Sequence, residues 1–276
     1  DQRSAGKSCK FHHDFTQDLS IDQHVDDAAA LVEQIQERFG VAKVYLIGGS
    51  WGTVVASNLA RRHPELVHKV VLRGTLVDAR RNEELSREFI LERLGSRIKP
   101  DDVPRPPYGS DVDALLRQRG YLTEAGGLTY ECFESRACSG WMLKAKVALK
   151  LLTAPEYSWA DVLRYHSCVT STLHRLWPEV EQYNASVTVS ELAVPLFLFH
   201  GRYDRCTSAE LVEGYFGQVR APQKHLVWFE RSGHQPDLEE PQRFQRLVLR
   251  AFLAEEFQVA ETDAALELEA PLRLVT

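Results

Sequence analysis

Residues 45–57, YLIGGSWGTVVAS, place a serine between glycines where an apolar run changes into a helical pattern. Within this stretch, GGSWG fits G-x-S-x-G, in which a sharp turn from strand to helix holds a serine in a strained backbone conformation. Glycines two positions before and two positions after the serine leave room for that turn. Ser50 would then stand at a helix N-terminus, where free backbone N–H groups favour developing negative charge. The stretch therefore predicts a strand, a nucleophile elbow and a helix.

Three further apolar runs predict strands, with helical patterns around them. The runs are nearly continuous rather than alternating, which is typical of parallel strands covered by helices on both faces. Ser20 with Gln23 fits a capping box at the first helix, and Gly40 fits its end. We expect strands at 41–49, 68–74, 194–201 and 225–231, and helices at 21–39, 51–63, 208–219 and 241–257. This layout predicts an α/β fold.

A long insert separates the second predicted strand from the third. It covers residues 76–192, with helical patterns and a proline-rich break at 99–109. Insertions after a strand of an open α/β sheet usually cover its carboxyl edge, where ligands bind. We expect a core formed by 1–75 and 193–257, a helical cap at 76–192 and a tail at 258–276.

A catalytic serine needs a base to remove its proton and a carboxylate to orient that base. After a nucleophile elbow, the acid comes next along the chain and the histidine comes last. Asp204 follows the third predicted strand, in HGRYDRCTS, and His234 follows the fourth, in ERSGHQPDLEEP. Both positions fall on the sheet edge that carries Ser50. The sequence therefore predicts Ser50 as nucleophile, Asp204 as acid and His234 as base.

Simpler interpretations exist for the same residues. Ser50 and Asp204 could each cap the helix that follows, and Asp237, three residues beyond His234, is a rival acid. We disfavour Asp237 because it lies on the loop of the histidine itself. His200 abuts the end of the third predicted strand and is expected to pack there. No H-E-x-x-H pattern and no G-x-x-x-x-G-K-[ST] loop occurs, so we expect neither a metal nor a cofactor.

Composition excludes several classes of protein. The 276 residues carry a formal net charge of -6 and no long basic run, which argues against nucleic-acid binding. No apolar stretch approaches the roughly 20 residues of a membrane helix, and residues 1–10 contain no signal-peptide core. We therefore expect a cytoplasmic protein without a membrane partner. Five scattered cysteines without a C-x-x-C pair predict reduced thiols, and Cys206 beside the predicted acid is given no role.

Taken together, the motifs resemble the α/β-hydrolase superfamily, and within it the prolyl aminopeptidase (proline iminopeptidase) group of serine peptidases. The matching segments, in family order, are DQRSAGKS (1–8), GGSWGT (48–53), GRYD (201–204) and SGHQPDLEEPQRF (232–244). The resemblance implies an α/β-hydrolase fold, with a mostly parallel sheet, flanking helices and an inserted helical cap. It also implies that Ser50, Asp204 and His234 form the triad, with the backbone N–H of Trp51 as one oxyanion donor.

The sequence departs from that group at its start. In the group, the D-Q-R segment follows a strand and an H-G-G-P-G loop that supplies the second oxyanion donor, whereas this sequence begins at Asp1. We therefore expect a fragment without the N-terminal strands, in which the strand at 41–49 is an unprotected edge. Losing one oxyanion donor costs roughly 100- to 1,000-fold in turnover. We expect the isolated chain to be poorly active or prone to aggregate.

Substrate binding is a second departure, because the group holds the free amino group of its substrate with acidic cap residues. Glu131, Glu134 and Glu156 are candidates here, with Gly49 beside the nucleophile, but no convincing match to the cap motif of the group is present. We expect a serine hydrolase that forms an acyl-enzyme and releases N-terminal proline from short peptides.

Three other functions are alternatives to an aminopeptidase. A carboxylic-ester hydrolase or lactonase would use the same triad on a small ester. A catalytically silent binding protein on a hydrolase scaffold belongs to a different class. Haloalkane and epoxide hydrolases are disfavoured because they carry an aspartate at the elbow.

Overall fold

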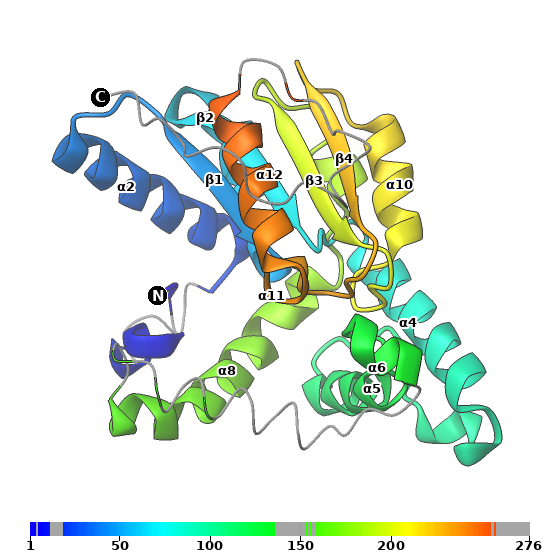
Figure 1. The fold of residues 1–276 in the computed structure, drawn as a ribbon. Helices are drawn as coiled ribbons and strands as arrows, with labels where there is room; N and C mark the ends of the chain where they lie inside the picture. Colours follow the sequence, from blue (N-terminus) through cyan, green and yellow to red (C-terminus); the bar gives the residue numbers. More distant parts are fainter. Residues whose placement is uncertain are drawn as a thin grey trace.

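The structure is a computed structural model that describes residues 1–3, 5–11, 19–135, 149, 153, 155, 158–254 and 257. At its centre lies a four-stranded sheet in which every neighbouring pair is parallel and the order is β1-β2-β3-β4 (Figure 1). The strands are β1 (Val44–Gly49), β2 (Val67–Arg73), β3 (Leu196–Gly201) and β4 (Lys224–Phe229). The predicted α/β fold with a parallel sheet is confirmed.

Helices precede, connect and follow these strands. Before β2 the structure has η1 (Gly6–Phe11), α2 (Ile21–Phe39), α3 (Trp51–Arg62) and η2 (Pro64–Leu66). Between β2 and β3 it has α4 (Ala79–Leu94), η3 (Gly95–Arg97), η4 (Pro100–Asp102), α5 (Val112–Glu124), α6 (Tyr130–Ser135), α8 (Trp159–Val180) and α9 (Ala185–Thr188). After β3 follow α10 (Ala209–Gln218), α11 (Pro236–Glu239) and α12 (Pro241–Leu253).

Helices cover both faces of the sheet because successive residues of a strand point to opposite sides. Leu72 and Leu198 belong to the core that includes residues of α2, α3 and α10. Val71 and Phe199 belong instead to a second core, with Phe244 of α12. Figure 1 shows α12 lying across that second face. The central strands are therefore apolar on both sides, as their continuous runs predicted.

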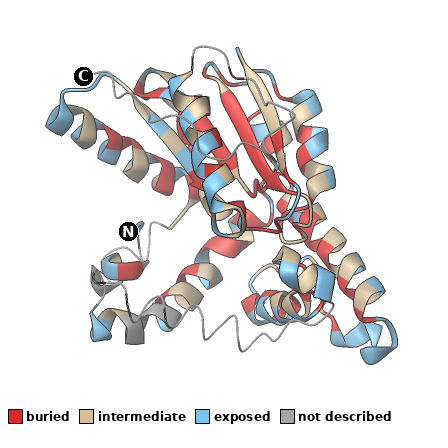
Figure 2. Ribbon diagram, viewed as in Figure 1, coloured by how far each residue is buried: buried red, intermediate tan, exposed pale blue. Residues whose placement is uncertain are grey.

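The edge strand β1 is an exception to that pattern. Its Tyr45 and Ile47 are 42% and 53% exposed, whereas every residue of β3 is buried (Figure 2). The prediction that all four strands are covered on both faces is wrong for β1, because no described element covers Tyr45 and Ile47 fully; within the described ranges this strand pairs with β2 alone. The prediction that it forms a sheet edge is confirmed.

The helix boundaries follow local capping chemistry. The Ser20 side chain accepts a hydrogen bond from the Gln23 N–H, and Gly40 ends α2 in the left-handed conformation at φ 64°. Only half of the predicted capping box forms, because the Gln23 side chain donates to Asp27. The last helix, α12, ends at Leu253 rather than at 257 as predicted.

The helices between β2 and β3 lie beyond one end of the sheet (Figure 1). α4 and α5 share a small apolar core of their own, formed by Ile90, Leu94, Val103, Leu122 and Ala125. Asn82 and Ser86 of α4 connect these helices to the loop after β3. The Asn82 side-chain NH2 donates to the Cys206 carbonyl, its Oδ1 accepts the Ser208 N–H, and the Ser86 hydroxyl donates to the Arg205 carbonyl. α4 thereby holds the loop that carries Asp204.

The cysteines differ from the prediction. Of the three whose side chains the structure describes, Cys132 and Cys168 are disulfide-bonded and Cys206 is free. Disulfide bonds persist mainly in oxidising compartments, so these two residues do not support the expected cytoplasmic location. Among the described residues, no helix combines the length and the apolar character needed to cross a membrane.

Candidate active site

The turn between β1 and α3 has the strained geometry that the sequence predicted. Ser50 has φ 52° and ψ −121°, and it is the one non-glycine residue with positive φ in the described part of the chain. Its N–H donates to the Arg73 carbonyl at 2.9 Å, and its carbonyl accepts the N–H of Thr53 at 2.8 Å. A Cβ atom at Gly48 would lie 2.6 Å from the Gly52 carbonyl oxygen, so close strand–helix packing requires that glycine. A Cβ at Gly52 would meet nothing, so the spatial requirement predicted there does not hold.

Ser50, His234 and Asp204 are joined by hydrogen bonds although they are far apart in the sequence. The Ser50 Oγ atom lies 2.9 Å from His234 Nε2, and His234 Nδ1 lies 2.9 Å from Asp204 Oδ2. Gly74 makes room for the imidazole, since a Cβ there would lie 3.0 Å from His234 Cε1. A base thus contacts the hydroxyl, and a carboxylate contacts the base, as nucleophilic catalysis requires.

The Asp204 carboxylate is fully buried and fixed by its own loop. Oδ1 accepts the backbone N–H groups of Cys206 and Thr207 at 2.8 and 2.9 Å, and Oδ2 accepts the Thr207 hydroxyl at 2.6 Å. Asp204 therefore holds the turn before α10, whereas the N-cap position of that helix is occupied by Ser208. The simpler interpretation, in which Asp204 caps the helix, is wrong, and the same carboxylate also reaches His234.

The rival residues have other partners. Asp237 forms an ion pair with Arg73 at 3.1 Å, and the Arg73 guanidinium also donates to the His234 carbonyl at 3.2 Å. Asp237 thus holds the histidine loop through Arg73. His200 is fully buried, as expected, and its Nε2 lies 3.0 Å from the Thr207 carbonyl oxygen.

Burial and charge act in opposite directions on these groups. Burial raises the pKa of Asp204, but His234 and the hydrogen bonds outweigh it and hold this pKa well below its ordinary value. Burial lowers the pKa of His234, but Asp204 and then Cys206 outweigh it and leave this pKa well above 6.5. Burial likewise raises the pKa of the Cys206 thiol, and the cations His234 and Arg119 bring it below its ordinary value.

These shifts predict the pH dependence of hydrolysis. A general base must be neutral, so kcat/KM falls as the pH drops through the pKa of His234 in the free enzyme. Because that pKa is raised, the midpoint of the acid limb is expected above pH 6.5. A pH–rate profile of kcat/KM checks this, and a midpoint below pH 6.5 would contradict it.

The strain at Ser50 predicts a separation of stability from activity. A residue with a Cβ at positive φ costs free energy that glycine avoids, so Ser50→Gly should be about 1 kcal/mol more stable than Ser50→Ala. Both variants lack the hydroxyl, so the comparison isolates the backbone. Urea unfolding of the two proteins measures the difference. Equal stabilities would mean that the turn stores no strain.

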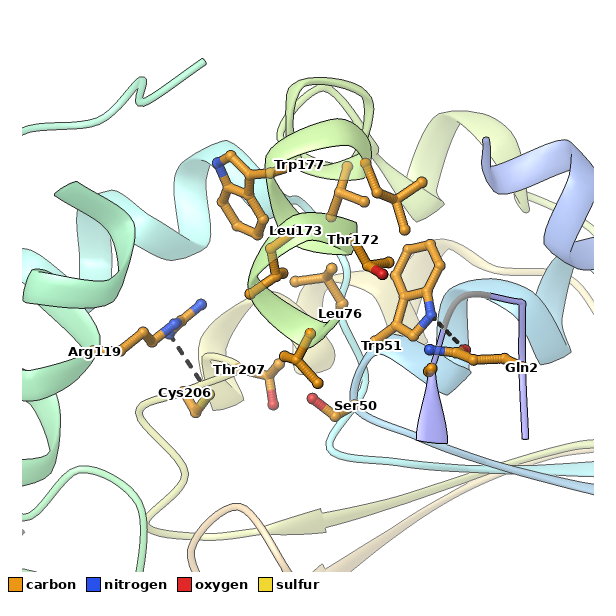
Figure 3. A pocket seen from close by; sticks show the side chains of 14 residues that line it. Gln2, Ser50, Trp51, Leu76, Arg119, Thr172, Leu173, Trp177, Cys206 and Thr207 are labelled. Carbon is orange, nitrogen blue, oxygen red and sulfur yellow. Dashed lines mark hydrogen bonds between the residues drawn. The ribbon is translucent and has the colours of Figure 1, made fainter. Parts of the chain in front are cut away.

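Ser50 lines a cavity of about 230 Å³ between the loops after β1 and β3 and the helices α5 and α8 (Figure 3). Leu173, Leu176, Trp177 and Val180 of α8 form much of its wall. On the other side the Trp51 indole lines the cavity and donates to the Gln2 side chain at 3.1 Å. Trp51 is also the first residue of α3, where backbone N–H groups lack partners within the helix.

The predicted substrate-binding residues lie elsewhere. Glu131 and Glu134 of α6 are exposed and do not line the cavity, and Glu156 lies outside the described residues. Gly49 packs against Arg73, whose guanidinium would meet a Cβ at that position. In the described ranges, no cluster of three or more His, Cys, Asp or Glu side chains could hold a metal ion.

Several residues at the site were not anticipated from the sequence. Thr207 completes the Asp204 hydrogen bonds, and the D-x-x-T spacing in DRCT was a local signal for it. Gly74 is the last residue of a predicted strand, and a glycine at that position was a signal that another group, here the His234 side chain, packs closely against the backbone. Asn82 lies on α4 and Arg119 on α5, and no sequence spacing connects them with Asp204 or Ser50.

Comparison with known proteins gives the family. The family model described as alpha/beta hydrolase fold matches residues 1–241. The chain belongs to the α/β-hydrolase family. This α/β-hydrolase is 25% identical over 259 residues to "Probable aminopeptidase YbaC" of Bacillus subtilis, covering 91% of this chain and 77% of that protein.

Two further matches are to proteins named proline iminopeptidase. This hydrolase is 34% identical to the "Proline iminopeptidase" of Xylella fastidiosa over 101 residues, which are 37% of this chain and 29% of that one. The crystal structure of the proline iminopeptidase of Mycobacterium smegmatis superimposes with a TM-score of 0.51 at 12% identity, covering 86% of this chain and 74% of that chain. At this identity the structural likeness shows a common fold and nothing finer.

Proposed function

We propose that this α/β-hydrolase is a serine hydrolase that works through an acyl-enzyme. The observation that carries the proposal is the unbroken contact from Asp204 through His234 to Ser50, with 2.9 Å at each step. Ser50 Oγ attacks the substrate carbonyl while His234 Nε2 takes its proton. His234 then gives that proton to the leaving group, and Asp204 keeps the imidazole in the required tautomer. Water activated by His234 releases the acyl group.

The negative oxygen formed in the first step needs hydrogen-bond donors. Ser50 immediately precedes α3, so the Trp51 N–H stands at a helix N-terminus next to the nucleophile. We assign this N–H as one oxyanion donor, because the free N–H groups and the helix dipole both favour negative charge there.

For the substrate, we propose a short peptide from which an N-terminal proline or a similar residue is released. The names of the relatives support this, since one is named a probable aminopeptidase and another a proline iminopeptidase. The cavity volume of about 230 Å³ suits a small acyl group such as a proline ring.

A carboxylic-ester hydrolase or lactonase is the second candidate, and the cavity wall favours it. The described lining residues include apolar side chains of α8 and no carboxylate that could hold a free amino group. A small ester with an apolar acyl group needs no such partner. A silent binding protein is a weaker candidate, because binding alone gives no reason for the aligned contacts of Ser50 and His234.

A panel of chromogenic substrates separates these candidates. We expect the purified chain to hydrolyse prolyl-4-nitroanilide faster than alanyl-4-nitroanilide, with 4-nitrophenyl butyrate as the ester in the same panel. Hydrolysis of the ester without either anilide would replace the aminopeptidase by the ester hydrolase. Failure with all three substrates, together with no fluorophosphonate labelling of Ser50, would contradict the proposed hydrolase function.

A further inference from the structure

One charged side chain faces the otherwise apolar and neutral cavity. Arg119 of α5 lines the same space as Ser50, and among the described lining residues it alone carries a charge. Figure 3 shows its guanidinium at the end of the cavity opposite Trp51, with Cys206 beneath it. A guanidinium is protonated at every working pH and offers five N–H donors.

The guanidinium is held in place from behind. Its Nη2 atom donates to the Glu83 carboxylate, which is fully buried in α4. The second oxygen of Glu83 accepts a hydrogen bond from the Gln118 side chain at 3.1 Å. The ion pair fixes one edge of Arg119 and leaves its other edge directed toward the cavity.

The cavity edge of Arg119 meets a poor acceptor. Nη1 points to the Cys206 sulfur at 3.6 Å, and a thiol accepts hydrogen bonds only weakly. A carboxylate oxygen accepts a much stronger, charge-assisted bond from the same donor. Because the donor is already oriented, a ligand would lose little free energy in ordering it.

We propose that the substrate of this site carries a carboxylate, which Nη1 of Arg119 binds beside the scissile bond. The inference rests on the proposed serine-hydrolase function and specifies its substrate class. A short peptide has such a carboxylate at its C-terminus, on the leaving-group side. A half-ester of a dicarboxylic acid has one on the acyl side. The negative charge of Glu83 offsets the positive charge of Arg119 at long range. The preference for a substrate with a carboxylate therefore comes from its direct hydrogen bond to Nη1.

Two pairs of esters test the proposal and locate the carboxylate. For the acyl side, the mono-4-nitrophenyl ester of glutarate is compared with its methyl-capped diester. For the leaving-group side, the butyryl ester of 4-hydroxybenzoate is compared with that of methyl 4-hydroxybenzoate. Charge-assisted hydrogen bonds are worth about 10- to 100-fold in binding, so we expect a preference of this size for the carboxylate member in one pair, mainly through KM.

Variants show whether Arg119 provides that preference. Removing Arg119 alone leaves Glu83 buried without a partner, which destabilises a fold. The double variant Glu83→Gln/Arg119→Gln removes both charges and is the main test, and it should lose the preference while hydrolysing the neutral ester. Arg117→Gln, an exposed arginine on the same helix, is the matched control and should keep the preference. Comparing ratios between variants cancels the intrinsic reactivity of each ester.

The outcomes separate this inference from the proposed function. Hydrolysis of the neutral esters with no preference in either pair of the wild type would overturn the inference and leave the serine hydrolase intact. An equal loss on both members of a pair in the folded double variant would assign Arg119 a structural role and overturn it too. No hydrolysis of any ester, together with no active-site labelling, would overturn the proposed function and this inference with it.

Discussion

Ser50→Ala is expected to reduce kcat by on the order of 10⁶-fold, which is the scale seen when a serine hydrolase loses its nucleophile. The reason is that Ser50 Oγ is the atom that would bond to the substrate carbonyl, and it is the atom that His234 Nε2 contacts at 2.9 Å. Steady-state hydrolysis of a chromogenic substrate measures the loss.

Ser57→Ala is the matched control for this substitution. Ser57 lies on α3, the helix that follows Ser50, is buried, and donates to the Val54 carbonyl of that helix at 3.3 Å. Its loss should leave the rate within a few-fold of the wild type. Comparable rates for Ser50→Ala and the wild type would show that another group is the nucleophile.

Asp204→Asn has the second-largest expected effect, about 10⁴-fold in kcat. An amide at this position can donate to His234 Nδ1, which favours the tautomer with its proton on Nε2 and prevents that atom from acting as the base. The Oδ1 atom of Asp204 also accepts the N–H groups of Cys206 and Thr207, and the amide oxygen of asparagine can keep that role. The measurement is kcat of the variant, with circular dichroism to confirm that it is folded.

Asp237→Asn decides between the two carboxylates near the histidine. Asp237 pairs with Arg73 and does not contact the imidazole, so its substitution should cost at most about tenfold, through a looser His234 loop. If Asp237→Asn proved as damaging as Asp204→Asn, the assignment of the acid would be wrong.

The local parts of the fold were predictable because short-range rules fix them. The elbow follows from glycines around Ser50, and the ends of α2 follow from Ser20 and Gly40. The positions of Asp204 and His234 follow from parallel topology, since the loops after β3 and β4 open at the same edge as the loop after β1. The proximity of Ser50, Asp204 and His234 could therefore be predicted from the sequence.

The residues that the helices between β2 and β3 bring to the site were not predictable in the same way. Arg119 reaches the cavity because Glu83 of another helix holds it, and this pairing has no periodicity in the sequence. Glu131 and Glu134 were chosen by residue type alone, and the packing of α6 leaves both exposed. Cys132 and Cys168 were expected as free thiols, because spacing along the chain does not reveal disulfide partners.

Labelling with a fluorophosphonate probe tests the central claim most directly, because the probe reacts with a serine only when a neighbouring base activates it. Mass spectrometry of the digested protein locates the adduct. The account predicts one adduct on the peptide that contains Ser50, absent in Ser50→Ala and strongly reduced in His234→Ala. An unlabelled wild-type protein, or undiminished labelling of Ser50→Ala, would contradict it.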